Sequence, residues 1–313
     1  FLFARLYQHR RGTQLSGKDR ENLDGFDPTL FQISEKELNF MLFTQRILLT
    51  AVWDVLEGAG IPPSLLHKTR TGVFVAAMKN FGGFESYPDE TALRSALTSG
   101  YVPALGLDCP DLPPRYYSRY YLQIYRLSDR IAYFLGTHGP SLTLETACSS
   151  SLVALTLAVN AIRDGSCDVA IVSAVNVTPR EYELALQATG VVSRQGECRP
   201  FDEDASGTLR CEGTACMVVC SMDWAKKHGY TGTIKSVIVN STIGSAGADP
   251  NVAQGSGRLY ESPNVFGMAE MIRLCHEQVG LPPEKICYVE AHGALLLTNP
   301  RGRPLGPTWV SPT

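Results

Sequence analysis

The middle of the chain carries a strand–helix–strand pattern that restricts the fold more than any other feature. Residues 141–144 predict a short strand, 148–163 a helix that is apolar on nearly every side, and 168–175 a buried strand that is apolar at most positions. A helix without a polar face is buried on most sides, and an apolar strand is covered on both faces of its sheet. The pattern therefore predicts a layered α/β domain with a largely parallel inner sheet.

The flanking segments repeat this alternation of strands and helices. A capping-box signature at 34–37 predicts the start of one long helix, which ends at Gly58–Gly60 before two prolines. The remaining predicted elements are strands at 71–78, 214–220, 231–240 and 286–291, and helices at 115–135 and 264–279.

The composition argues against several kinds of partner. With 28 basic and 31 acidic residues, the net charge of −3 gives no reason to expect nucleic acid or an anionic membrane. No apolar run approaches the roughly 20 residues that span a bilayer. Because 44% of the residues are apolar, a sizeable core is available. We therefore expect a soluble cytoplasmic enzyme or enzyme domain.

The chain has nine cysteines, an odd number, and no Cys-x-x-Cys pair. Reduced thiols, most of them buried apolar groups, are the expected state. One cluster raises the question of zinc; it consists of Cys198, Cys211, Cys216, Cys220 and His228. The cysteine spacings of 13, 5 and 4 fit none of the usual zinc-finger patterns. We therefore predict no metal site.

Cys148 is the first candidate for catalysis. It lies in Glu145-Thr146-Ala147-Cys148-Ser149-Ser150-Ser151, between a predicted strand and a predicted helix. The N-terminus of a helix has unpaired N–H groups and a partial positive charge, which stabilise a thiolate and the oxyanion of a thioester intermediate. The arrangement follows the logic of a nucleophile elbow with sulfur in place of oxygen. A buried structural cysteine is an equally good interpretation of these residues alone.

His292 is the second candidate. It follows a predicted strand in Tyr288-Val289-Glu290-Ala291-His292-Gly293. Strand ends are where α/β folds place reacting groups, and a histidine there can hydrogen-bond a substrate carbonyl or exchange protons with a thiol. Taken alone, a hydrogen-bonded structural histidine is the better interpretation.

Together, the two motifs resemble the active-site motifs of β-ketoacyl synthases. The likeness is closest to the ketosynthase domains of modular and iterative polyketide synthases and of animal-type fatty acid synthases. It runs from about Phe26 to Gly293 in the family's order. Supporting matches are Phe26-Asp27-Pro28, Gln45-Arg46, Thr71-Gly72-Val73-Phe74-Val75, Arg130-Ile131-Ala132-Tyr133-Phe134-Leu135-Gly136, Gly139-Pro140-Ser141 and Cys198-Arg199-Pro200-Phe201-Asp202.

The resemblance implies a thiolase-like fold that works as a homodimer. Cys148 would accept an acyl chain from an acyl-carrier-protein thioester, and a malonyl-type extender would lose CO₂ and attack it. The product would be a β-ketoacyl thioester. His292 matches the first of two active-site histidines, which is implicated in decarboxylation and in stabilising the enolate oxygen. No intrinsic cofactor is implied, since the acyl groups arrive on the phosphopantetheine of the carrier protein.

The likeness ends after Gly293. The family continues with Thr-Gly-Thr and carries its second histidine in a later Lys-Ser-Asn-x-Gly-His block, whereas this sequence continues Ala294-Leu295-Leu296-Leu297 and lacks that block. We therefore expect an incomplete N-terminal edge at 1–25, an incomplete ketosynthase domain at 26–293 and a divergent, irregular tail at 294–313. Apolar surface that the rest of such a domain would cover should be exposed.

Two other functions stay open at this point. The absent second histidine favours a truncated, catalytically inactive ketosynthase-like interaction protein. A thiolase or other non-decarboxylating acyltransferase is a third interpretation. The Thr146-Ala147-Cys148-Ser149-Ser150 block argues against it, because thiolases have a different context around their cysteine.

Overall fold

The computed structural model describes residues 3–8, 26–38, 41–78, 126–177, 186, 192–193, 195–199, 202, 206–245, 264–290 and 292. The chain forms two compact units. The first comprises residues 1–182 and 211–237, and the second comprises residues 183–210 and 238–313. The tail predicted at 294–313 and the first half of the helix predicted at 115–135 lie outside the described residues, and the domain limits at 26 and 293 stay a prediction.

The first unit contains a five-stranded sheet in the order β1-β5-β4-β2-β3. Its strands are β1 (Phe3–Gln8), β2 (Thr71–Ala77), β3 (Ser141–Leu144), β4 (Val169–Asn176) and β5 (Gly213–Cys220). β2 is parallel to β3 and β4, whereas β5 is antiparallel to β4 and β1. The prediction of a largely parallel sheet is therefore only half right, because the pattern of apolar residues does not encode strand direction.

The two central parallel strands, β2 and β4, are part of the hydrophobic core. Every residue of β2 is buried, and β4 is buried over its first five residues. In the register, Val73 lies between Ile171 on β4 and Ser141 on β3. Strands covered on both faces need apolar side chains at successive positions, which is the pattern of the sequence in both segments.

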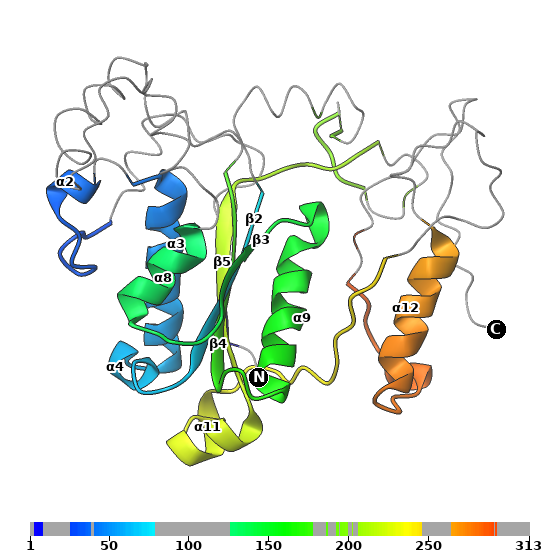
Figure 1. The fold of residues 1–313 in the computed structure, drawn as a ribbon. Coiled ribbons are helices and arrows are strands. Elements are labelled where there is room, and N and C mark those ends of the chain that lie inside the picture. The colour runs from blue at the N-terminus through cyan, green and yellow to red at the C-terminus, as the bar shows by residue number, and fades with distance from the viewer. Residues whose placement is uncertain are drawn as a thin grey trace, which may run out of the picture. The chain divides into compact units, whose positions relative to one another are not determined.

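Helices cover both faces of this sheet (Figure 1). α3 (Phe43–Ala59) and α8 (Arg126–Leu135) lie on one face, and α9 (Ser150–Arg163) lies on the other. α9 contacts β2 and β4, and its buried residues include the small side chains of Ala154, Ala158 and Ala161. It is buried along this stripe and not on most sides as predicted, since Leu152 is 68% exposed.

The long helix predicted from residue 34 is two helices, α2 (Glu35–Leu38) and α3. The predicted cap is present, because the Ser34 hydroxyl accepts a hydrogen bond from the Glu37 N–H at 3.2 Å. Leu42 is extended, and its N–H donates to the side chain of buried Gln45 at 3.1 Å. α3 thus has its own start. The described part of the first unit also contains two short α-helices, α4 (Pro63–Leu66) and α11 (Met222–His228).

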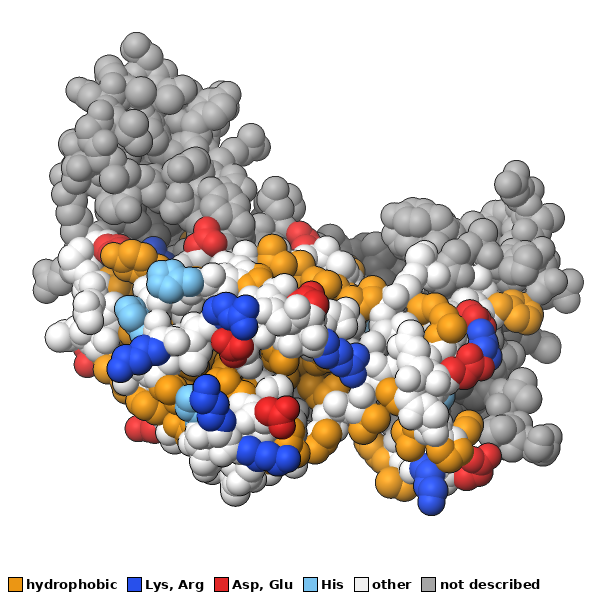
Figure 2. Space-filling model, turned by 60° about the horizontal axis from the view of Figure 1, so that its bottom comes forward, with side chains coloured by type: hydrophobic (Ala, Val, Ile, Leu, Met, Phe, Trp, Pro, Cys, Tyr) orange, Lys and Arg blue, Asp and Glu red, His pale blue; other side chains and the backbone are white. Residues whose placement is uncertain are grey.

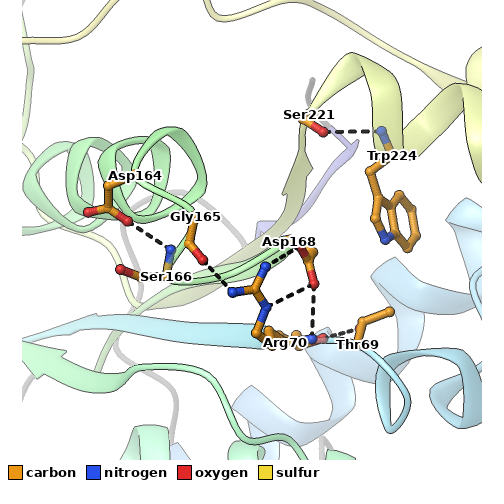
Figure 3. Close-up of polar contacts among 9 residues, drawn as sticks. Thr69, Arg70, Asp164, Gly165, Ser166, Asp168, Ser221 and Trp224 are labelled. Atoms are coloured by element: carbon orange, nitrogen blue, oxygen red, sulfur yellow. Dashed lines mark hydrogen bonds and ion pairs between the residues drawn. The ribbon is translucent and has the colours of Figure 1, made fainter.

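An ion pair joins the starts of β2 and β4 (Figure 3). Arg70 donates from Nη2 to Asp168 Oδ1 at 3.0 Å and from Nη1 to the Gly165 carbonyl at 2.7 Å. The Asp168 N–H donates back to the Arg70 carbonyl at 2.7 Å. Beside it, hydrogen bonds from the side chain and N–H of Ser166 hold the pKa of Asp164 below its usual value. The contacts connect two strands that are 98 residues apart in the sequence.

We expect Arg70→Ala to lower the free energy of unfolding by about 1 kcal/mol, as is usual for exposed, hydrogen-bonded ion pairs. The two side chains are 61% and 39% exposed, so water screens the attraction. Urea unfolding with and without added salt measures the effect. Added salt should reduce the difference in free energy of unfolding between the unchanged chain and the variant. Lys68→Ala, at an exposed position in the same turn, is the matched control. A loss of about 3 kcal/mol or more would mean that the pair behaves as a buried one.

The second unit contains one long described helix, α12 (Val265–Glu277). The Asn264 side chain caps it by accepting hydrogen bonds from the N–H groups of Phe266 and Gly267. The strands predicted at 231–240 and 286–291 do not form among the described residues. Residues 231–233 make a short 3₁₀ helix, and in the part of the chain that the structure describes no strand forms over 234–240 or 286–290. Alternating apolar residues fit a strand, but a strand also needs a hydrogen-bonded neighbour.

Many apolar side chains of this unit are exposed. Among the described residues of the second unit they are Leu209, Val239, Ile243, Phe266, Met268, Ile272, Val279, Ile286, Tyr288 and Val289. On the face drawn in Figure 2, basic and acidic side chains are interspersed and neither sign forms a continuous patch. In the part of the chain that the structure describes, no helix is long and apolar enough to cross a membrane.

Candidate active site

Cys148 lies on a sharp turn between β3 and α9. A single 3₁₀ turn, Ala147–Ser149, joins the strand to the helix. Ala147 has φ +52°, a left-handed conformation that is uncommon for a residue with a Cβ. The turn leaves the Cys148 side chain exposed. The predicted strand-to-helix elbow is therefore confirmed, and a buried structural cysteine is ruled out.

Hydroxyl groups of the next two residues hold this turn. The Ser150 hydroxyl accepts from the Thr146 N–H at 2.8 Å and donates to the Ala147 carbonyl at 2.7 Å. The Ser149 hydroxyl donates to the Thr146 carbonyl at 2.7 Å and lies 2.9 Å from the Thr146 hydroxyl. The sequence interpretation did not find these roles. The run of three serines after the cysteine was the only available signal.

The N-terminus of α9 gives this turn its electrostatic character. α9 has 14 residues, and it begins at Ser150, two positions after Cys148. The first N–H groups of a helix have no partner within the helix, and the aligned peptide dipoles place positive charge at this end. Negative charge on the oxygen of a group attached to the Cys148 sulfur would be stabilised there.

Three other thiols of the first unit, Cys167, Cys216 and Cys220, are more buried than Cys148. Burial raises the pKa of Cys167 to about 11 and that of Cys220 to about 11. Burial also raises the pKa of Cys216 to about 12, although the Ser173 hydroxyl donates a hydrogen bond to its sulfur at 3.1 Å. A thiol is nucleophilic only as its thiolate. These three thiols are therefore protonated at neutral pH, whereas Cys148 is exposed and lies beside a helix N-terminus.

We expect iodoacetamide at pH 8 to modify Cys148 in the native chain and to leave Cys167 and Cys216 unmodified. A thiol with a pKa near 12 is ionised in only about one molecule in ten thousand at that pH, and both side chains are 1% exposed. Peptide mapping after timed labelling measures each site, and labelling in urea is the control in which all three react. Labelling of native Cys216 as fast as Cys148 would contradict the prediction.

His292 belongs to the second unit, where it is exposed. The residues before it do not form the buried strand that was predicted, since Tyr288 and Val289 are 74% and 69% exposed. Tyr288 donates a hydrogen bond to Glu290, and this bond raises the pKa of the tyrosine. Cys148 belongs to the first unit, and a joint action of the two residues stays a prediction.

The sequence matches the β-ketoacyl synthase N-terminal domain family over residues 4–225. It is 32% identical over 289 residues to a phenolphthiocerol/phthiocerol polyketide synthase of Mycobacterium tuberculosis, and the match covers 91% of this chain and 14% of that protein. It is 30% identical over 277 residues to the polyketide synthase PksN of Bacillus subtilis, covering 87% of this chain and 4% of that protein.

Solved structures give the same result. The oxazolomycin ketosynthase domain of Streptomyces albus superposes with a TM-score of 0.68 at 32% identity, covering 86% of this chain and 41% of that one. The ketosynthase from module 6 of the Bacillus subtilis bacillaene synthase superposes with a TM-score of 0.64 at 26% identity, covering 88% and 42%. The chain thus spans less than half of each of these ketosynthases. It belongs to the β-ketoacyl synthase family and is part of a ketosynthase domain of the polyketide synthase type, with a thiolase-like fold.

Proposed function

We propose that Cys148 is the acyl-accepting nucleophile of a 3-oxoacyl-acyl-carrier-protein synthase. The observation that carries the proposal is the exposed thiol on a strained strand-to-helix turn at the N-terminus of α9. In a family of condensing enzymes, such a thiol has the access and the electrostatic surroundings that thioester exchange requires.

In the first step, the Cys148 thiolate attacks the carbonyl carbon of an acyl thioester. The carbonyl oxygen gains negative charge, which N–H groups at the start of α9 would stabilise. The carbon–sulfur bond to the phosphopantetheine arm of the carrier protein then breaks. The arm leaves as a thiolate and takes up a proton, and the acyl group remains on Cys148. The acyl carrier protein is thus the first partner that we propose.

In the second step, a malonyl-type thioester loses CO₂ and its enolate carbon attacks the acyl carbonyl on Cys148. The new carbon–carbon bond forms as the bond to the Cys148 sulfur breaks, so the products are a β-ketoacyl thioester and free thiolate. His292 would donate a hydrogen bond to the enolate oxygen. We propose that this chemistry takes place in a homodimer, as the family resemblance implies.

Mass spectrometry of the intact chain and of its peptides tests the first step. The purified chain is incubated with a panel of acyl thioesters of increasing chain length, carried by phosphopantetheine on an acyl carrier protein. One acyl mass should be added, and it should map to the peptide that contains Cys148. Absence of an adduct on Cys148 with every thioester would overturn the proposal. The comparisons do not favour the alternative of a catalytically inactive interaction protein.

A further inference from the structure

We infer that Ser149 and Ser150 are positioning residues for Cys148, because their hydroxyl groups hold the turn that presents its thiol. The inference rests on the proposed role of Cys148 as acyl acceptor and adds the residues through which that role is set up. Neither serine is assigned a chemical step. Ser149 bonds the backbone of Thr146, and Ser150 bonds the backbone of both Thr146 and Ala147, immediately before the cysteine.

The turn needs support because Ala147 is strained. Its φ of +52° brings Cβ close to backbone atoms, and only glycine adopts this region without a penalty. A non-glycine residue stays there when surrounding contacts over-determine its conformation. The Ala147–Cys148 peptide plane depends on this angle. If Ala147 relaxed to a negative φ, that plane would turn and the Cys148 side chain would leave its place beside the N-terminus of α9.

Ser150 supplies the strongest of these contacts. Its single oxygen accepts from the Thr146 N–H and donates to the Ala147 carbonyl, at 2.8 and 2.7 Å. It therefore bonds the backbone on both sides of the strained residue. The side chain is buried, with 6% of its surface exposed, so water cannot readily replace it. Loss of such a partner destabilises the folded turn, because the backbone groups left behind are shielded from water and stay unpaired.

Ser149 makes a second and weaker contact of the same kind. Its hydroxyl donates to the Thr146 carbonyl at 2.7 Å and lies 2.9 Å from the Thr146 hydroxyl. Ser149 is exposed, and water can take over part of its role. The next serine, Ser151, is also exposed and is a matched control.

The test measures the rate at which Cys148 reacts with iodoacetamide, followed by peptide mapping, in the full 313-residue chain. We expect Ser150→Ala to slow this reaction roughly tenfold, because it removes hydrogen bonds that are shielded from water. Ser149→Ala should slow it roughly threefold, because water can replace part of the hydrogen bonds that it removes. Ser151→Ala should react like the unchanged chain. Acyl loading from the carrier-protein thioester is measured in parallel and should fall in the same order.

A rescue separates positioning from general destabilisation. Glycine adopts a positive φ without support, so Ala147→Gly combined with Ser150→Ala should react within about threefold of Ala147→Gly alone, because no strain is left for the hydroxyl to offset. Labelling of buried Cys216 in the same samples reports whether the fold has opened. If Ser150→Ala opens the fold, Ser149→Ala carries the test, and an unchanged Cys148 rate in that variant would overturn the inference.

The outcomes distinguish this inference from the proposed function. If the unchanged chain takes up no acyl group but Ser150→Ala still slows alkylation, the proposed function fails and the positioning role stands. If the unchanged chain is acylated and a folded Ser150→Ala variant reacts at Cys148 at the same rate, the positioning role fails. A slow Ser150→Ala variant that glycine at 147 does not rescue would also overturn it.

Discussion

Replacing Cys148 with alanine is expected to abolish acyl loading of the chain. The thiol is the attacking group in the proposed first step, and no neighbouring side chain of the described turn can replace it, since serine hydroxyls are poor nucleophiles without a general base. We expect the rate of loading from an acyl thioester to fall by at least about a hundredfold. Intact-mass measurement over time, with carrier-protein thioester in excess, gives this rate directly.

Two controls make this result specific to the Cys148 turn. Cys211→Ala removes another exposed thiol of the first unit and should leave loading unchanged. Since Cys148 is exposed, Cys148→Ala should alter the free energy of unfolding by no more than about 0.5 kcal/mol, which urea unfolding can confirm. Equal loading of the Cys148→Ala and unchanged chains would show that the acyl group resides elsewhere.

The candidate nucleophile could be located from the sequence because its surroundings are local. A short apolar run, a break and a longer apolar run predict a strand, a turn and a helix. The structure gives Ser141–Leu144, Ala147–Ser149 and Ser150–Arg163 for the three. The position of Cys148 at the start of the helix follows from this order alone, without any contact to a distant part of the chain.

The detail of the turn could not be predicted in this way. Alanine prefers a negative φ, so nothing in its own propensity indicates +52° at position 147. The angle is held by hydrogen bonds from Ser149 and Ser150. These are side-chain contacts to specific backbone atoms, and a pattern of polar and apolar residues does not contain them.

Long-range strand pairing explains the other differences between the predicted fold and the structure. β5 pairs antiparallel with β4 and with β1, which begins at Phe3, and strand direction depends on how distant segments meet. The apolar segments at 234–240 and 286–290 have a strand-like sequence but do not form strands among the described residues. Periodicity predicts which side chains would share a face, whereas a strand also requires a neighbour. The expected position of His292 at a strand end depended on such a neighbour.

Replacing Gly139 with alanine is expected to destabilise the first unit by about 3 kcal/mol or more, at the upper end of what overpacking usually costs. A Cβ at this position would lie 2.4 Å from the Thr71 carbonyl oxygen and 2.8 Å from the Gly72 nitrogen. Both are backbone atoms of buried β2, so they cannot move aside as the end of a side chain could. The Gly139 N–H also donates to the Thr71 carbonyl at 3.1 Å.

The damage should extend to the Cys148 turn. Gly139 precedes β3, and the Pro140 carbonyl accepts a hydrogen bond from the Val73 N–H at 2.7 Å as the β2–β3 pairing begins. Displacing this pairing moves the strand that leads into the elbow. We therefore expect Gly139→Ala also to slow alkylation of Cys148 in whatever fraction stays folded. Urea unfolding followed by pulsed labelling of Cys216 on β5 measures the stability of the first unit itself.

Gly58→Ala provides the opposite case in the same unit. Gly58 lies in the last turn of α3, and a Cβ there would meet no atom within 4 Å. At a helical position alanine is favoured over glycine by up to about 0.5–1 kcal/mol, so this variant should shift the urea midpoint upward. The same substitution thus raises the free energy of unfolding at one glycine and lowers it at the other, because Gly58 faces open space and Gly139 faces the backbone of β2. A Gly139→Ala chain as stable as the unchanged one would show that β2 and β3 do not approach as closely as these contacts require.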